Sequence, residues 1–144
     1  MSALVEVEKV TTPTEFQTLR DTMLAMPQVE IPVKHYFCNG VYAREIFIPK
    51  GTIALGKIHK TEHINIISQG DVTVVSHTGR QRIHAPHTAV VGVGQCAAYA
   101  HEDTIWTTFL ATTETDPEAI ETLFIAPSYD DALMVEIMKL LGGK

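Results

Sequence analysis

The sequence predicts a mainly β protein, an antiparallel sandwich or barrel with helices confined to its two ends. Between residues 33 and 113, apolar and polar residues alternate in short segments that are rich in β-branched side chains. Turn-forming residues recur at short intervals through the same region. Short strands joined by tight turns are typical of antiparallel sandwiches and barrels, and do not suit βαβ units.

A short helix is expected over residues 12–27, because its first turn carries several N-terminal signals. Thr12 stands at the N-cap, Pro13 occupies the first helical position, and Glu15 completes a capping box. Apolar side chains then recur at helical spacing, at Phe16, Leu19, Met23 and Met26. Pro27 is expected to end the helix.

The β core is expected over about residues 33–113, with seven to nine strands joined by hairpins. Six turn signals divide it: Asn39-Gly40, Pro49-Lys50-Gly51, Gln69-Gly70-Asp71, Thr78-Gly79, Ala85-Pro86 and Gly92-Val93-Gly94. Glycine and asparagine tolerate positive φ, and proline fixes φ, so these residues mark places where the chain reverses.

The last part of the chain, about residues 115–142, is expected to return to helix. Thr115 and Glu118 have the spacing of a second capping box, and a further helix is expected to begin at Ser128. Leu133, Ile137 and Leu140 form an apolar stripe that either packs on the core or forms a self-association face. No linker or repeat divides the chain, so we expect one domain over residues 1–144.

Composition limits the classes of partner. The chain has 144 residues and a net charge of −6, which argues against binding to a nucleic-acid polymer but allows a small phosphorylated ligand in a locally basic pocket. No apolar run is long enough for a membrane span, and the first residues lack the features of a signal peptide. Cys38 and Cys96 are expected to be buried thiols in a reducing compartment. We therefore expect a cytoplasmic protein with no membrane partner.

The stretch "GTIALGKIHKTEHINIISQG" resembles the first motif of the cupin family. Gly51 and Gly70 match the two ends of that motif, and His59 falls on its second ligand histidine. Lys57 stands in place of the first histidine, and His63 stands in place of the acidic ligand. Among the ligand positions of this motif, only His59 therefore keeps the family's residue in the family's place.

The stretch "GVGQCA" is similar to the second cupin motif. Gly92 replaces its proline, and Ala97 stands where the family has a ligand histidine. Together the two motifs imply an antiparallel double-stranded β-helix, the cupin jelly roll, with a short N-terminal helix and C-terminal helices. Because small cupins tend to pair and open sheet edges need covering, the resemblance also implies a homo-oligomer.

Five stretches, some of which overlap the first motif, are similar to small, uncharacterised cupin-type proteins of tailed bacteriophages and prophages. They are "GVYAREIFIPKGT", "IHKTEH", "ISQGDVTV", "YAHEDTIWTT" and "IAPSYDD". The chain departs from that group at Thr61, where related sequences often carry another histidine. This resemblance implies a phage protein made in the cytoplasm of a bacterial host.

Seven side chains are expected to form a cationic and aromatic cup that binds a small ligand. They are Arg44, Lys57, His59, His63, Tyr99, His101 and Trp106. Lysine and arginine suit a phosphate group and aromatic rings suit stacking, so the favoured ligand is a small anionic or nucleotide-like molecule. This interpretation requires no cofactor. A phage protein of this kind would sequester a host immune signal.

Two other functions stay open. His59 and His63 would face each other around a hairpin at Lys60-Thr61-Glu62, and His101 or Glu62 would supply a third donor for Fe, Mn, Ni or Zn. The protein would then be a metal-dependent cupin enzyme, of oxygenase, isomerase or hydrolase type, acting on a small polar substrate. In the remaining alternative it is a structural or assembly protein of the virion, and its histidines have no ligand.

Overall fold

The computed structural model describes residues 12–129, which form eleven strands and two helices. The strands are β1 (Val33–Cys38), β2 (Val41–Ile48), β3 (Ile53–Leu55), β4 (Ile58–His59), β5 (His63–Gln69), β6 (Asp71–Ser76), β7 (Gly79–His84), β8 (His87–Val91), β9 (Cys96–Ala100), β10 (Thr104–Ala111) and β11 (Ile125–Ala126). The helices are α2 (Pro13–Leu24) and α3 (Pro117–Phe124).

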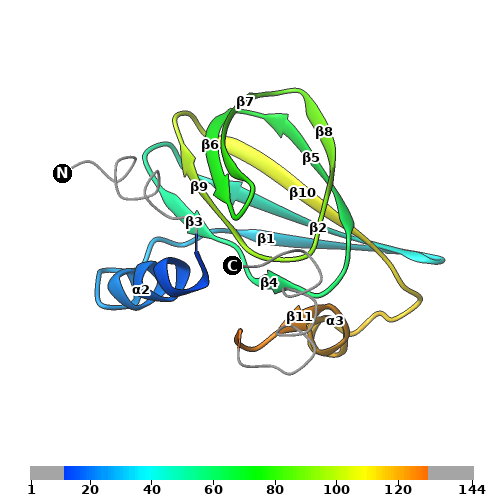
Figure 1. Ribbon diagram of the computed structural model, residues 1–144. Coiled ribbons are helices and arrows are strands. Elements are labelled where there is room, and N and C mark those ends of the chain that lie inside the picture. The colour runs from blue at the N-terminus through cyan, green and yellow to red at the C-terminus, as the bar shows by residue number, and fades with distance from the viewer. Residues whose placement is uncertain (1–11, 130–144) are drawn as a thin grey trace.

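Two antiparallel sheets face each other (Figure 1). One has five strands in the order β1-β2-β10-β5-β8, and the other has four in the order β3-β9-β6-β7. A small sheet of β11 and β4 lies beside α3, at the end of the molecule away from β7 (Figure 1). The predicted mainly β, antiparallel architecture is confirmed, with both described helices outside the β core.

The six turn signals all fall where one strand gives way to the next. The number of strands is higher than predicted, because residues 33–113 contain ten strands and not seven to nine. The extra strands come from the stretch between Gly51 and His63, which forms the short β3 and β4. β4 leaves the main sheets to pair with β11, a pairing that has no local sequence signal.

Gly70 shows why one of these turns requires glycine. Its φ is +116°, and a Cβ built on it would lie 2.2 Å from Oγ1 of Thr104. The turn between β5 and β6 therefore passes so close to the start of β10 that no side chain fits.

Helix α2 begins as predicted. The backbone N–H of Glu15 donates to Oγ1 of Thr12, and the backbone N–H of Thr12 donates to Glu15 Oε1, each at 3.2 Å. Phe16 and Leu19 are buried against the outer face of the four-stranded sheet. Met26 is 58% exposed, because the helix ends at Leu24 and Met26 no longer follows the helical stripe.

The C-terminal part differs from its prediction in two ways. The N-cap of α3 is Asp116 and not Thr115, because Pro117 takes the first helical position and the residue before it becomes the cap. α3 is then followed at once by strand β11, in a region expected to be helical. The expected helix from Ser128, with its stripe of Leu133, Ile137 and Leu140, lies almost wholly outside the described residues.

The apolar core fills one part of the space between the sheets. Its buried members come from both sheets: Ile48, Ile67 and Trp106 from one, and Val72, Ile83, Ala98 and Ala100 from the other. The remaining space between the sheets is not filled, and it forms the cavity described below. None of the helices within residues 12–129 has both the length and the hydropathy of a membrane span.

Candidate functional site

A cavity of about 430 Å³ lies between the two sheets, next to the apolar core. This volume falls within the range of roughly 300–1,000 Å³ that is usual for small-molecule sites. Its walls are the inner faces of β1, β2, β5, β10 and β9, and residues of α3 and of the β8–β9 connection complete it.

A row of polar side chains crosses the floor of this cavity. His35 on β1 is paired with Arg44 on β2, Arg44 is paired with Thr108 on β10, and Thr108 is paired with Asn65 on β5. All four line the cavity, so they form one continuous line across four neighbouring strands. We call these four residues the polar row.

An apolar row lies two residues further along the same strands. It consists of Val33, Ile46, Trp106 and Ile67, which are paired in the same order. Trp106 is buried and also lines the cavity. A ligand in the cavity would therefore meet hydrogen-bonding groups on one line and a flat apolar surface beside it.

Hydrogen bonds fix the orientation of the polar row. Oγ1 of Thr108 donates to Oδ1 of Asn65 at 2.8 Å, which leaves the Asn65 amide nitrogen as a donor. Nδ1 of His35 and the hydroxyl of Tyr42 are hydrogen-bonded at 2.6 Å. Burial raises the pKa of Tyr42 despite the opposing charge of Arg44, so this hydroxyl is neutral.

Arg44 supplies a positive charge to the cavity. Within residues 12–129 it has no acidic partner. The acidic residue next to it, Glu45, faces the other side of the sheet and lies 3.9 Å from Lys34. A half-buried guanidinium without a carboxylate favours a bound anion, because its charge is only partly solvated.

His59 and His63 stack on each other, with ring centroids 4.0 Å apart and ring planes 26° apart. Burial, followed by the neighbouring His63, Arg44 and Lys57, lowers the pKa of His59 to about 3. Burial also lowers the pKa of His63, although its Nδ1 donates to the carbonyl oxygen of Thr61 at 3.2 Å. Both imidazoles are therefore neutral near pH 7. Nδ1 of His59 is buried and has no hydrogen-bond partner in the described part of the chain.

The two histidines meet without the predicted hairpin. Residues 60–62 do reverse the chain, but β4 pairs with β11 and not with β5. The backbone of His59 also exchanges two hydrogen bonds with Gly94, at 2.8 and 3.0 Å. The turn thus carries the chain from the small sheet into the five-stranded sheet.

Lys57 lines the cavity, but its charge is already compensated. Its Nζ lies 2.5 Å from Oε1 of Glu121 on α3, and both side chains are about half exposed. Lys60 also holds α3, since its backbone N–H donates to the carbonyl oxygen of Phe124 at 2.8 Å. Lys57, directly before β4, therefore holds this segment to α3 beside the cavity, and it is not a free cation for a ligand.

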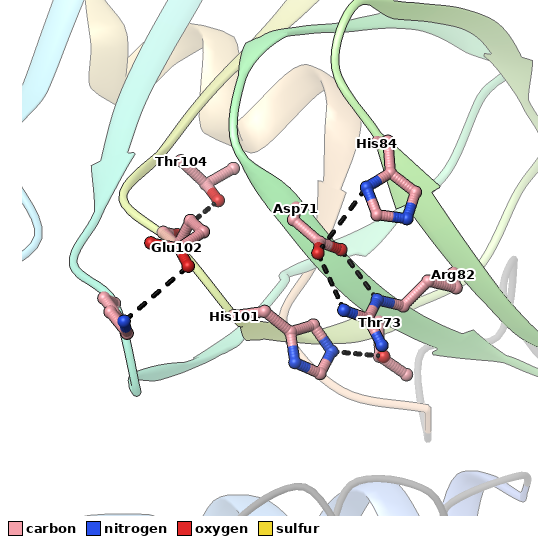
Figure 2. Close-up of polar contacts among 8 residues, drawn as sticks. Asp71, Thr73, Arg82, His84, His101, Glu102 and Thr104 are labelled. Carbon is pink, nitrogen blue, oxygen red and sulfur yellow. Dashed lines mark hydrogen bonds and ion pairs between the residues drawn. The ribbon is translucent and has the colours of Figure 1, made fainter.

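Tyr99 and His101 do not belong to the cavity, which corrects their assignment to the cup. Both lie on the outer face of the four-stranded sheet, because Cys96 and Ala98 take the inward positions of β9. Tyr99 packs near Phe16 of α2. Nε2 of His101 is hydrogen-bonded to Oγ1 of Thr73 at 2.8 Å, and Figure 2 shows it beside Asp71, Arg82 and His84.

The same alternation corrects the alignment of the second motif. Ala97 packs outward against Phe16, so a side chain at this position would not reach the cavity. The positions of β9 that do reach it are Cys96 and Ala98. Burial raises the pKa of Cys96 to about 11, so its thiol is protonated. Cys38 is exposed at the end of the edge strand β1, contrary to the expected burial.

The described side chains do not fit a metal ion. Imidazole binds a metal in the plane of its ring, at roughly 2.0–2.1 Å for zinc. His59 and His63 are stacked with their ring planes only 26° apart, so the two rings lie face to face and do not direct their edges at a common metal ion. Glu62 is exposed in the turn, and His101 lies on the other side of the four-stranded sheet. Within residues 12–129, no group of three histidine, cysteine or acidic side chains could hold a metal ion.

Sequence reasoning missed three members of the polar row, His35, Asn65 and Thr108. None of them stands at a ligand position of either cupin motif. A usable signal existed, because Asn65 is two residues from His63, and Thr108 is two residues from Trp106. Strand alternation places such residues on one face, so the inward positions of His63 and Trp106 predict those of Asn65 and Thr108.

Comparisons with known proteins rest on structure. No family model and no curated protein matches the sequence. Among solved structures, ectoine synthase from P. lautus has a TM-score of 0.55 at 12% identity, over 74% of this chain and 85% of that chain. A cupin superfamily protein from Desulfitobacterium hafniense DCB-2 has a TM-score of 0.51 at 8% identity, over 60% of this chain and 81% of that chain.

An RmlC-like cupin family protein from Methanocaldococcus jannaschii, described as a double-stranded β-helix, is also similar. Its TM-score is 0.50 at 12% identity, over 64% of this chain and 86% of that chain. This chain has the cupin fold. The expected jelly roll is thereby confirmed. Within this cupin fold, the polar row lies on the inner face of the five-stranded sheet.

Proposed function

We propose that this cupin-fold protein binds a small anionic molecule between its sheets, with Arg44 as the anion-binding group. The observation that carries the proposal is the position of Arg44 in the polar row, facing a cavity of about 430 Å³ without an acidic partner among residues 12–129. Charge-assisted hydrogen bonds from a guanidinium to an anion contribute roughly 1.5–3 kcal/mol each.

The second part of the proposal concerns the rest of the ligand, for which a ring is favoured. Trp106 and the apolar row lie beside Arg44 in register, and the stacked His59 and His63 border the same cavity. A nucleotide-like molecule would place its charged group on Arg44 and its ring on the apolar surface. Capture of such a molecule needs no catalytic group and no cofactor.

The biological role that we propose rests on the similarity to small phage proteins. A phage protein that holds a nucleotide-like anion would sequester a host immune signal in the bacterial cytoplasm. The partner is then a small molecule, and neither a nucleic-acid polymer nor a membrane takes part.

A metal-dependent enzyme is the second candidate. It is favoured by one observation, the buried Nδ1 of His59 that has no partner in the described residues. Ectoine synthase, which has a similar fold, is an enzyme by its name. This candidate requires His63 to turn out of the stack and a further ligand to be supplied. No observation separately favours a virion structural role.

Thermal unfolding and elemental analysis on the same preparation test the proposal. The melting temperature should rise with added nucleotide or carboxylate, because a ligand at 100 times its Kd stabilises the fold by about 2.7 kcal/mol. The Arg44→Gln variant should lose that rise, and Arg20→Gln, which changes an exposed arginine on α2, should keep it. One equivalent of a transition metal per subunit that survives dialysis against a mild chelator would instead support the enzyme.

A further inference from the structure

The number of charged side chains around the cavity limits the charge that a bound ligand can carry. Three lining side chains carry a formal charge: Arg44, Lys57 and Glu121. Lys57 and Glu121 neutralise each other at 2.5 Å. Apart from its four histidines, His35, His59, His63 and His77, the described part of the cavity therefore presents a single net positive charge, on Arg44.

The stacked imidazoles of His59 and His63 do not add a second charge. His59 and His63 stack with centroids 4.0 Å apart, and two positive charges at that distance repel each other strongly in a half-enclosed site. His59 also lies close to the charges of Arg44 and Lys57. The pair therefore offers neutral nitrogen atoms to a ligand.

Two backbone N–H groups at or near the cavity are already used by other acceptors. α3 reaches the cavity with its first residue, Pro117, but its N-terminus is already occupied by a carboxylate. Oδ1 of Asp116 accepts the backbone N–H of Glu118 at 3.2 Å. In the glycine-containing connection from β8 to β9, the N–H of Gly94 donates to the carbonyl oxygen of His59 at 3.0 Å.

We infer that the cavity selects ligands whose recognised group carries a single negative charge, either a phosphodiester or a carboxylate, over phosphate monoesters. This inference rests on the proposed function. A phosphate monoester carries about −1.5 to −2 at pH 7, so part of its charge would enter the cavity without a partner. A phosphodiester or carboxylate matches the one charge of Arg44. The amide nitrogen of Asn65 supplies an uncharged donor for the rest of the ligand.

Calorimetric titration at pH 7.5 with three commercial compounds tests the inference. Cyclic AMP and AMP share base and sugar, and differ in whether the phosphate is a diester or a monoester. Benzoate provides a carboxylate on a ring and distinguishes the two sources of a single charge. We expect cyclic AMP or benzoate to bind at least about tenfold tighter than AMP, which is a clear difference in such a titration.

The variants Arg44→Gln and Arg20→Gln complete the test. Binding should be lost or weakened at least about tenfold in Arg44→Gln and should be unchanged in Arg20→Gln, with both variants melting near the parent temperature. AMP binding as tightly as the other two, through Arg44, would overturn the preference for a single charge and leave the proposed function intact. No binding of any of the three at about 5 mM, or binding that does not depend on Arg44, would overturn both.

Discussion

Lys57 and Glu121 show how one contact changes what a single residue is expected to do. From sequence, Lys57 is a cation that would hold an anionic ligand directly. In the structure it lies 2.5 Å from Glu121, so its removal leaves a carboxylate beside the cavity. The loss of ligand affinity in Lys57→Met would then come from repulsion by Glu121, and not from a lost contact.

A double-mutant cycle separates these two causes. Lys57→Met alone should weaken binding of the anionic ligand several-fold. The combined Lys57→Met and Glu121→Gln variant should recover to within about twofold of the parent, a difference of about 0.4 kcal/mol. Titration calorimetry on the four proteins measures this. An equal loss in the single and double variants would mean that Lys57 contacts the ligand directly.

His59 predicts how stability depends on pH. Its pKa is lowered to about 3 in the folded protein, mainly by burial, against 6.5 for the unfolded chain. The unfolded chain therefore binds a proton between these pH values that the folded chain does not, so this histidine makes stability fall as pH falls below 6.5. In this range the free energy of unfolding falls by roughly 1.4 kcal/mol for each pH unit.

Urea denaturation at pH 7 and pH 4.5 measures this effect. Between pH 7 and pH 4.5, the free energy of unfolding of the parent protein should fall by about 2–3 kcal/mol more than that of His59→Asn. His87→Asn, at a partly exposed histidine on β8, is the control and should behave as the parent. Identical pH dependence in the parent and in His59→Asn would contradict the account of His59.

At the scale of elements, α2 is held to the four-stranded sheet by its buried face. Phe16 is 2% exposed and packs near Val75 and Ala97, whereas Met26, beyond the end of the helix, is 58% exposed. Phe16→Ala should lower the free energy of unfolding by about 3–5 kcal/mol. Met26→Ala should change it by no more than about 0.5 kcal/mol. Similar losses in both variants, measured by urea denaturation, would contradict this packing.

The elements differ in how well sequence predicts them. The start of α2 and the hairpin turns are predicted well, because capping residues, glycine and proline act locally. β11 and its pairing with β4 are missed, because each of these strands has two residues and the pairing joins segments far apart in the sequence. The cap of α3 lies one residue after the predicted Thr115, because Pro117 occupies the first helical position and makes Asp116 the cap.

The whole molecule explains why only part of the site could be predicted. Arg44, Lys57, His59, His63 and Trp106 line the cavity as expected for a cup. Tyr99 lies on the opposite face of the four-stranded sheet. Successive residues of a strand point to opposite faces, so an error of one residue in the alignment places a side chain on the wrong face. His101 follows the end of β9, where alternation gives no rule. The polar row is visible only when four strands are placed in order, which no local pattern provides.

For the whole molecule, the homo-oligomer stays a prediction. The single domain over residues 1–144 also stays a prediction. β1 forms one edge of the five-stranded sheet, and all six of its residues are exposed. The unpaired backbone N–H and C=O groups of such an edge strand can form hydrogen bonds with a strand of another chain. Light scattering after size-exclusion chromatography should give a mass of at least twice 15.9 kDa. A mass of 15.9 kDa at micromolar concentration would contradict it.

The central claim is that the cavity binds an anion through Arg44, and the single tryptophan of the chain can report this directly. Trp106 lines the cavity in the row next to Arg44, so a bound ligand should alter its fluorescence. Titration of the parent with cyclic AMP or benzoate, excited at the red edge of tryptophan absorption, should give a saturable change. We predict that Arg44→Gln loses this change and Arg20→Gln retains it. An identical titration curve for the parent and Arg44→Gln, or no change in either, would contradict the claim.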